Sequence, residues 1–274
     1  MGTEHKLVSM SEKYESAMAR FAAANLAVTN AMARILKERY NISAVALHDR
    51  PAYQFKPLLA DDRETFLKNL PEAIEKSESI KSGRCRLLVS STSWTPDDDF
   101  SILLSALESY ALEAASNSYL PEILAIITGK GPLKQKYMRD VDSLSREGKL
   151  KKVQVKSAWL STKDYALLLG AADLGVSLHT SSSGVDLPMK VVDMFGTGLP
   201  VVGWSRYEAW RELVQEGVNG KGFQSSTELT KLLTSLFHQN SVELKELRNG
   251  AMQECSRRWD DEWDPVAGKL FHLV

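Results

Sequence analysis

Apolar positions recur along this chain in two ways, at the spacing of a helix and in short runs typical of buried strands. Before residue 51 the predicted order is helix 11–24, strand 25–29, helix 31–40 and strand 43–47. From residue 86 a longer alternation begins. Its predicted strands are 87–90, 123–128, 153–155, 174–178 and 200–203, and its predicted helices are 100–115, 133–144, 162–171 and 207–214. Strands alternating with helices predict an α/β fold with a parallel sheet.

The polarity of the connecting segments divides the chain into four parts. Residues 1–51 are too short for a domain, and the polar residues 52–83, with a helical part near 63–70, favour a linker. Residues 84–250 are predicted as a Rossmann-like domain in which a parallel sheet is flanked by helices. Residues 251–274 are predicted as a C-terminal helix.

Composition excludes several classes of function. The 274 residues carry a formal net charge of −1, so nothing attracts nucleic acid or an anionic membrane in bulk. Cys85 and Cys255 have no metal-ligand spacing, which favours free thiols and no metal. No apolar run reaches the roughly 18 residues of a membrane span. No sequence pattern of a nucleophilic hydrolase or a zinc site is present.

The most informative segment is LHTSSSGVDLPMKVVDMFGT, residues 178–197, which follows a predicted strand. Pro188 suits the first turn of a helix, whose free N–H groups and dipole then form an anion site beside the Ser/Gly loop. Lys190 adds a positive charge, and Asp193 could accept hydrogen bonds from the two hydroxyls of a ribose. The segment therefore predicts a nucleotide diphosphate site. As alternatives, Lys190 could pair only with Asp186 or Asp193, and Asp193 could face solvent.

Two glycines follow the predicted strand 123–128. Gly129 and Gly131, which flank Lys130, would let a backbone approach a ligand closely. The alternative is a tight turn between strand and helix. The third glycine of the dinucleotide fingerprint is missing, so this motif alone does not identify a cofactor.

Hydroxyl side chains follow the predicted strand 87–90. Ser91 and Ser93 could bind phosphate oxygens, and Asp97–Asp99 could suggest a metal site. We favour helix capping for these aspartates, because they stand where the next helix begins. His179 could bind a sugar or phosphate, or it could be structural. In a parallel sheet all these loops gather at the carboxyl edge, where ligands bind.

Four motifs carry a resemblance to a known family. They are SSTSWTPDDDFSILLSALE, ITGKGPL, LLLGAADLGVSLHTSSSGVDLPMKVVDMFG and LPV. In this order they resemble the C-terminal half of a GT-B glycosyltransferase, and more narrowly the chitobiosyldiphosphodolichol β-mannosyltransferases. The resemblance runs from about Tyr14 to Trp263.

The resemblance implies two Rossmann-like domains facing each other across a cleft, the C-terminal one holding GDP-mannose. Such an enzyme adds the first β-1,4-mannose to dolichol-diphosphate-linked chitobiose in N-glycan precursor assembly, at the cytosolic face of the endoplasmic reticulum. The first roughly 45 residues resemble only the last β-α-β piece of the N-terminal acceptor domain. We therefore expect a donor-binding half with an N-terminal remnant: a fragment, a splice form or a truncated paralogue.

Carried over residue by residue, Asp193 matches the acid that holds the donor ribose. The partner acid of related enzymes falls at Val185, and Asp186 is its nearest candidate. The Arg and Lys that many relatives carry after the first strand of this domain are not found, so Lys190, Lys130 and the Pro188 helix would hold the diphosphate. The expected donor-binding residues are Ser91, Ser93, Gly129, Lys130, Gly131, His179, Ser182, Ser183, Gly184, Asp186, Leu187, Pro188, Lys190 and Asp193.

The implied reaction inverts the anomeric centre in one displacement and needs a base for the acceptor hydroxyl. No base, cofactor or metal is assigned in this chain. One alternative is a catalytically silent module that binds a nucleotide sugar or docks on other transferases at the endoplasmic reticulum. A nucleotide-sugar epimerase of the same architecture is weaker, because it leaves the mannosyltransferase-like motif unexplained.

Overall fold

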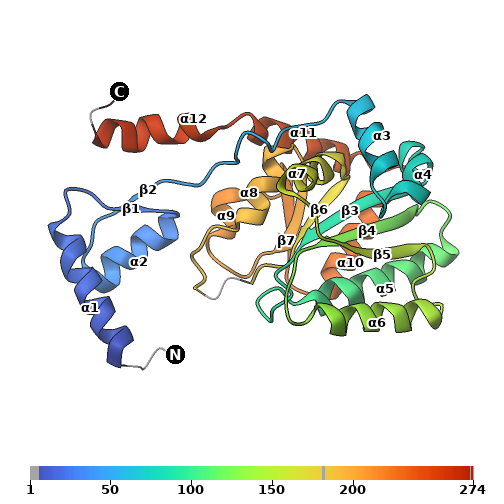
Figure 1. Cartoon of the computed structure of the whole chain (residues 1–274), viewed down its shortest axis with the longest axis horizontal. Helices are drawn as coiled ribbons and strands as arrows, with labels where there is room; N and C mark the ends of the chain where they lie inside the picture. Colours follow the sequence, from blue (N-terminus) through green and yellow to red (C-terminus); the bar gives the residue numbers. More distant parts are fainter. Residues whose placement is uncertain (1–5, 181–182, 272, 274) are drawn as a thin grey trace.

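The centre of the molecule is a parallel sheet of six strands in the order β5-β4-β3-β6-β7-β8. The computed structural model describes residues 6–180, 183–271 and 273 (Figure 1). The strands are β3 (Cys85–Ser91), β4 (Glu122–Thr128), β5 (Val153–Ala158), β6 (Leu174–Ser177), β7 (Val201–Trp204) and β8 (Gly220–Phe223). This order, with the chain starting in the middle and growing to both sides, confirms the predicted Rossmann-like α/β fold.

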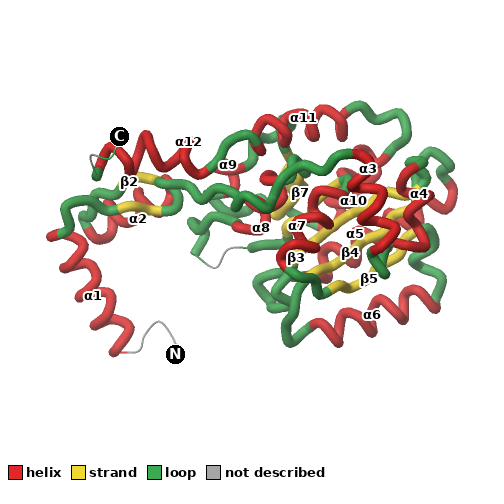
Figure 2. The backbone as a smooth tube through the Cα atoms, turned by 45° about the horizontal axis from the view of Figure 1, so that its top comes forward, coloured by secondary structure: helices red, strands yellow, loops and turns green. Residues whose placement is uncertain are grey.

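Helices cover both faces of the sheet (Figures 1 and 2). One face carries α5 (Phe100–Ser116), α6 (Lys134–Arg146) and α10 (Ser226–Phe237). The other carries α3 (Ala60–Asn69), α4 (Ser77–Lys81), α7 (Thr162–Ala171), α8 (Met189–Gly196) and α9 (Trp210–Leu213). Helix α11 (Glu243–Cys255) contributes side chains to the cores of both faces. We call residues 85–255 the sheet domain.

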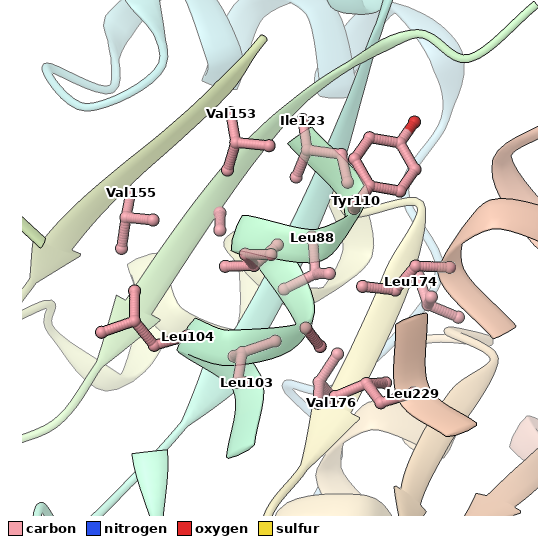
Figure 3. Packing of buried hydrophobic residues seen from close by; sticks show 14 of the residues in the cluster. Leu88, Leu103, Leu104, Tyr110, Ile123, Val153, Val155, Leu174, Val176 and Leu229 are labelled. Carbon is pink, nitrogen blue, oxygen red and sulfur yellow. The ribbon is translucent and has the colours of Figure 1, made fainter. Parts of the chain in front are cut away.

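Each face of the sheet has its own apolar core because side chains alternate along a strand. Leu88 of β3 packs with Leu103 and Tyr110 of α5, as Figure 3 shows. Its neighbours Leu87 and Val89 belong to the opposite core. A strand buried on both faces reads as a continuous apolar run, which is why β3 and β4 could be predicted from the sequence.

Two elements of the sheet domain were not predicted. Strand β8 reads Gly-Lys-Gly-Phe, which has neither apolar alternation nor a β-branched residue. Helix α10 does carry a signal: Ser225 caps its N-terminus by accepting from the Glu228 N–H, and leucines follow at helical spacing. The predicted helix 207–214 is shorter in the structure, at Trp210–Leu213.

The polar residues 52–83 pack on the sheet domain. They form α3, the short 3-10 helix Ile74–Lys76 and α4. Five of their apolar side chains are buried in the same core as Leu87 and Val89, namely Phe55, Leu67, Leu70, Ala73 and Ile80. The domain boundaries at residues 51, 83 and 250 stay predictions.

Residues 6–50 form a small separate lobe (Figures 1 and 2). It contains α1 (Lys6–Phe21), β1 (Leu26–Ala27), α2 (Asn30–Tyr40) and β2 (Val45–Ala46), and its two short strands pair in parallel. We call residues 6–50 the N-terminal lobe. The end of the chain returns to this lobe through α12 (Trp259–Trp263) and a π-helical turn at Asp264–Gly268. Within the described residues, no helix combines the length and apolar character needed to cross a bilayer.

Candidate nucleotide-sugar site

The candidate site lies where the strand order reverses, between β3 and β6. At such a switch point the loops after neighbouring strands diverge and leave a crevice at the carboxyl edge of the sheet. Here the loops after β3 and β6 are tied together. Asp98 and His179 form an isolated β-bridge, and the Thr180 N–H and hydroxyl both donate to the Asp97 carbonyl, at 3.1 and 2.8 Å.

Asp98 is the buried anchor of this crossing. Its Oδ2 accepts from the Lys190 ammonium at 2.5 Å and from the Ser93 N–H and hydroxyl, each at 2.7 Å. Burial alone would raise the pKa of this carboxyl, but Lys190 and Ser93 outweigh it and hold the pKa below its usual value. Asp99 caps α5 through the Ser101 N–H, as predicted. Asp98 instead holds Lys190.

Lys190 therefore pairs with Asp98, and not with Asp186 or Asp193, the two partners considered as alternatives to phosphate binding. Its ammonium still has donors to spare, because it carries three protons. The N-terminus of α8 adds more. Pro188 is the N-cap, one position earlier than predicted, and its carbonyl accepts from Val191 and Val192. Among the described residues, nothing accepts from the N–H groups of Met189 or Lys190. Anions favour such a helix end.

Asp186 and His179 form a pair at the rim of the site. The Asp186 carboxylate lies 2.6 Å from His179 Nε2 and accepts from the Ser183 hydroxyl at 2.9 Å. The edge of the Tyr207 ring meets the His179 ring, with 5.9 Å between centroids. His179 is thus held in place by its neighbours, as expected for the structural alternative, and its ring stays partly exposed.

The other expected donor-binding residues of this loop differ in conformation and burial. Gly184 adopts a left-handed φ of 75°, which a glycine tolerates best, and its carbonyl accepts from the Glu208 N–H at 3.2 Å. The Leu187 side chain is buried in the core beneath α8. Ser182 lies outside the described residues.

Gly129 and Gly131 are needed for contact between two loops. A Cβ on Gly129 would lie 1.8 Å from the Thr92 carbonyl oxygen, and one on Gly131 would lie 1.8 Å from that of Ser93. Gly129 also has a φ of 121°. The close approach predicted for these glycines is thus made to the protein's own backbone. It fixes the loop after β4 against the loop after β3.

Ser91 is buried and engaged inside the protein. Its hydroxyl lies 2.9 Å from the Tyr165 hydroxyl and accepts from Thr128 Oγ1 at 3.1 Å. A hollow of about 280 Å³ opens beside this network, lined by Thr128, Gly129, Trp159, Leu160, Thr162 and Tyr165. The Lys130 ammonium sits 3.9 Å from the centroid of the exposed Trp159 ring.

Sequence reasoning missed Trp159 as a site residue. The strand was predicted to end at Val155, whereas β5 continues to Ala158 and delivers the tryptophan to the carboxyl edge of the sheet. An aromatic residue directly after a longer strand would have been the signal.

Asp193 has the most unusual environment of the site. It lies on α8, one turn beyond the helix start, and is half-buried. No hydrogen bond or ion pair joins its carboxylate to another described residue. Burial raises its pKa to about 7. Its charge also acts on Tyr165, whose pKa is raised mainly by burial, so the two side chains are near one another.

These groups suit a polar anionic ligand. Free N–H groups and a lysine can bind phosphate oxygens, and an unpaired carboxylate can accept from hydroxyls. Within the described ranges, no three His, Cys, Asp or Glu side chains are placed to hold a metal ion together.

Known proteins include relatives of this chain at 39–54% identity. No protein-family model matches it. It is 54% identical to the chitobiosyldiphosphodolichol β-mannosyltransferase of Arthroderma benhamiae, over 100% of this chain and 62% of that protein. It is 39% identical to the protein of that name from Mus musculus, over 96% of this chain and 59% of the relative. Identity to the Arabidopsis thaliana UDP-glycosyltransferase TURAN is also 39%, over 100% of this chain and 68% of TURAN.

Solved structures share the fold at low sequence identity. Anabaena HepE in complex with UDP and glucose superposes with a TM-score of 0.68 at 19% identity, over 92% of this chain and 64% of HepE. A sucrose-phosphate synthase from Thermosynechococcus elongatus gives 0.66 at 14% identity, over 94% and 59%. These neighbours are GT-B glycosyltransferases.

The chain spans about 60% of the length of the curated mannosyltransferases it matches. The match runs through the whole described sheet domain and the N-terminal lobe. Identity of 39–54% over essentially the entire chain, together with the GT-B architecture, places this protein in the chitobiosyldiphosphodolichol β-mannosyltransferase family.

Proposed function

We propose that this chain is the donor-binding half of an inverting, GDP-mannose-dependent transferase that adds the first β-1,4-mannose to dolichol-diphosphate-linked chitobiose. The single observation that carries the proposal is the arrangement on α8. Among the described residues nothing accepts from the Met189 and Lys190 N–H groups that begin the helix, and nothing pairs with the Asp193 carboxylate one turn later. In a nucleotide sugar the diphosphate could contact the N–H groups while the ribose contacts the carboxylate.

The phosphate groups would lie against the start of α8. Its N–H groups and dipole favour negative charge, and Lys190 supplies the nearest ammonium. Asp98 offsets part of that ammonium charge, so we assign the larger share of phosphate binding to the backbone. The same groups would stabilise the departing diphosphate when the glycosidic bond forms.

The nucleobase would lie in the hollow beside Trp159. An exposed aromatic ring with a lysine over it offers a stacking surface and donors for ring acceptors. Guanine is our choice because of the mannosyltransferase names of the relatives. The name of TURAN and the ligand of HepE contain UDP, so uracil is the competing base to test.

We propose the acceptor and the location by analogy with the family. The base that removes the proton from the acceptor hydroxyl would come from outside the described site, because Asp193, whose carboxylate has no partner among the described residues, is used for the ribose. We place the reaction at the cytosolic face of the endoplasmic reticulum, where other dolichol-pathway transferases would be partners. Donor binding should need no Mn²⁺ or Mg²⁺, since α8 and Lys190 neutralise the diphosphate.

The test is calorimetric titration with GDP-mannose, GDP and UDP-glucose, without divalent cations. We expect GDP-mannose to bind, and Asp193→Ala and Lys190→Ala to weaken it. Asp140→Ala is the matched control, because Asp140 is exposed on α6, on the opposite face. Preference for UDP-glucose, or strict dependence on a metal, would contradict the proposal.

Transfer is tested separately with a lipid-linked chitobiose acceptor. The assay is run with this chain alone and with the N-terminal half of a longer relative added. Binding with no transfer in either case would favour the second candidate function, a silent module that binds a nucleotide sugar or docks on a partner transferase.

A further inference from the structure

The N-terminal lobe holds the donor loop through one buried hydroxyl. Thr29 Oγ1 donates to the Val185 carbonyl at 2.5 Å and accepts from the Met32 N–H at 3.0 Å. The threonine is completely buried. A single hydroxyl therefore caps α2 of the lobe and fastens the loop that leads into α8 of the sheet domain.

A carboxylate of the sheet domain fixes the same end of α2. Glu212 of α9 accepts from the N–H groups of Asn30 and Ala31 at 2.6 and 2.8 Å, and from the Asn30 side chain at 2.9 Å. Burial would raise the pKa of Glu212, but His48 and these N–H groups hold it below its usual value. The N-terminus of α2 is thus docked on α9 while Thr29 reaches the donor loop.

The hydrogen bond from Thr29 reaches the loop close to the start of α8. Val185 lies between Ser183 and Pro188, three residues before the N-cap of α8. The loop has polar ties on either side, through Ser183 to Asp186 and through the Gly184 carbonyl to the Glu208 N–H. A shift of the Val185 carbonyl would move the start of α8 and with it the N–H groups offered to phosphate.

We propose that Thr29 is a positioning residue for donor binding. From the N-terminal lobe it holds the loop of residues 183–187 in place. This inference rests on the proposed function of α8 as the diphosphate site. Lobe placement and donor affinity are then coupled, and the coupling is reciprocal: donor binding should also hold the lobe more firmly.

Three substitutions separate the two tasks of the hydroxyl. Thr29→Ser keeps both the cap and the donation to Val185. Thr29→Asp keeps the cap, since aspartate is a good N-cap, but an ionised carboxylate cannot donate to a carbonyl. Thr29→Val removes both. Two quantities are measured: amide hydrogen exchange of Ser183–Lys190 in the free protein, and the Kd for GDP-mannose by calorimetry.

We expect Thr29→Ser to behave like the unaltered chain. Thr29→Asp and Thr29→Val should exchange faster in Ser183–Lys190 while β3 and β4 stay protected, and both should bind GDP-mannose about 3- to 10-fold more weakly, the value of one hydrogen bond. Reduced affinity alone would also follow from general damage, so protection in β3 and β4 is the internal control.

The inference is overturned if Thr29→Asp matches the unaltered chain, since only capping would then matter, or if Thr29→Ser is as impaired as Thr29→Val. If Thr29→Val also loses protection in β4, the comparison of Thr29→Asp with Thr29→Ser decides. If the unaltered chain binds no GDP-mannose, the proposed function fails, while loop exchange in the free protein still tests whether Thr29 holds the loop.

Discussion

The sheet domain and the N-terminal lobe are held together by different forces. The sheet domain has an extensive apolar core on each face. In the lobe each strand has two residues and α1 has no buried residue. Five apolar side chains of α1 are exposed instead, namely Leu7, Met10, Tyr14, Met18 and Phe21. The lobe is joined to the sheet domain by hydrogen bonds and ion pairs around Thr29 and Glu212.

This contrast means that the two regions respond to different perturbations. Burial of apolar area is the dominant stabilising term of a fold, so the sheet domain should tolerate changes in the lobe. Charged and polar contacts depend on geometry and on salt, so the lobe should shift its position before the sheet domain loses stability.

The largest difference in the free energy of unfolding should appear when a buried phenylalanine of the sheet domain and an exposed one of the lobe are each replaced. Phe237 of α10 is fully buried and meets the Tyr110 ring edge-on, while Phe21 of α1 is 85% exposed. We expect Phe237→Ala to lower the free energy of unfolding by about 3–5 kcal/mol. Phe21→Ala should change it by less than about 0.5 kcal/mol. Urea unfolding followed by circular dichroism measures both, and equal effects would refute the contrast.

Asp193 is a half-buried carboxylate in the otherwise apolar interior of the sheet domain, and it should make the stability of the protein depend on pH. Its pKa is 3.8 in a free chain and about 7 in the fold, so the folded state binds the proton more tightly. This group therefore lowers stability as pH rises from about 4 to about 7. We expect Asp193→Asn to stabilise the protein by of order 2 kcal/mol at pH 8 and by little at pH 4. A gain independent of pH would contradict this account.

The same carboxylate should link donor binding to protons. Asp193 accepts from two ribose hydroxyls only when ionised, so binding of GDP-mannose should release a proton and strengthen between pH 6 and pH 8. Calorimetry in two buffers of different ionisation enthalpy counts that proton. Asp193→Ala should bind at least about 10-fold more weakly and lose the pH dependence. Proton uptake on binding would exclude this role.

The smallest effect is expected at the rim of the lobe. Arg34 pairs with Glu208 at 2.5 Å, but the two side chains are 54% and 47% exposed. We expect Arg34→Met to cost about 0–1 kcal/mol, since solvent screens such pairs. Thermal unfolding at low and high salt checks it. A larger loss that persists in high salt would show that the lobe relies on this pair more than its exposure suggests.

The fold could be predicted from the sequence because each buried element carries its own pattern. The predicted helix 162–171 has the same bounds as α7, and the strand 123–128 differs from β4 by one residue. Strand β8 was not predicted because its glycines give it no apolar pattern. It is held in place by pairing with β7.

The position of the site could be predicted from the sequence, but the pairing of its side chains could not. The loops were expected at one edge of a parallel sheet, and the structure brings them together there. The pairing of Lys190 with Asp98 joins residues 92 positions apart, and no local pattern determines which of several carboxylates meets a given lysine. Trp159 was missed for a similar reason, since the strand length that places it is set by pairing with β4.

The two glycines after β4 divide the site into a part that is fixed and a part that can change. Any side chain at Gly129 or Gly131 would overlap the backbone at Thr92 or Ser93, so this seam can accept no substitution without moving the loop beside it. Lys130, which lies between them, instead places its ammonium over the exposed Trp159 ring. If the nucleobase lies beside Trp159, as proposed above, a change of nucleotide preference would proceed through this lysine and this tryptophan, while the backbone around the two glycines stays the same.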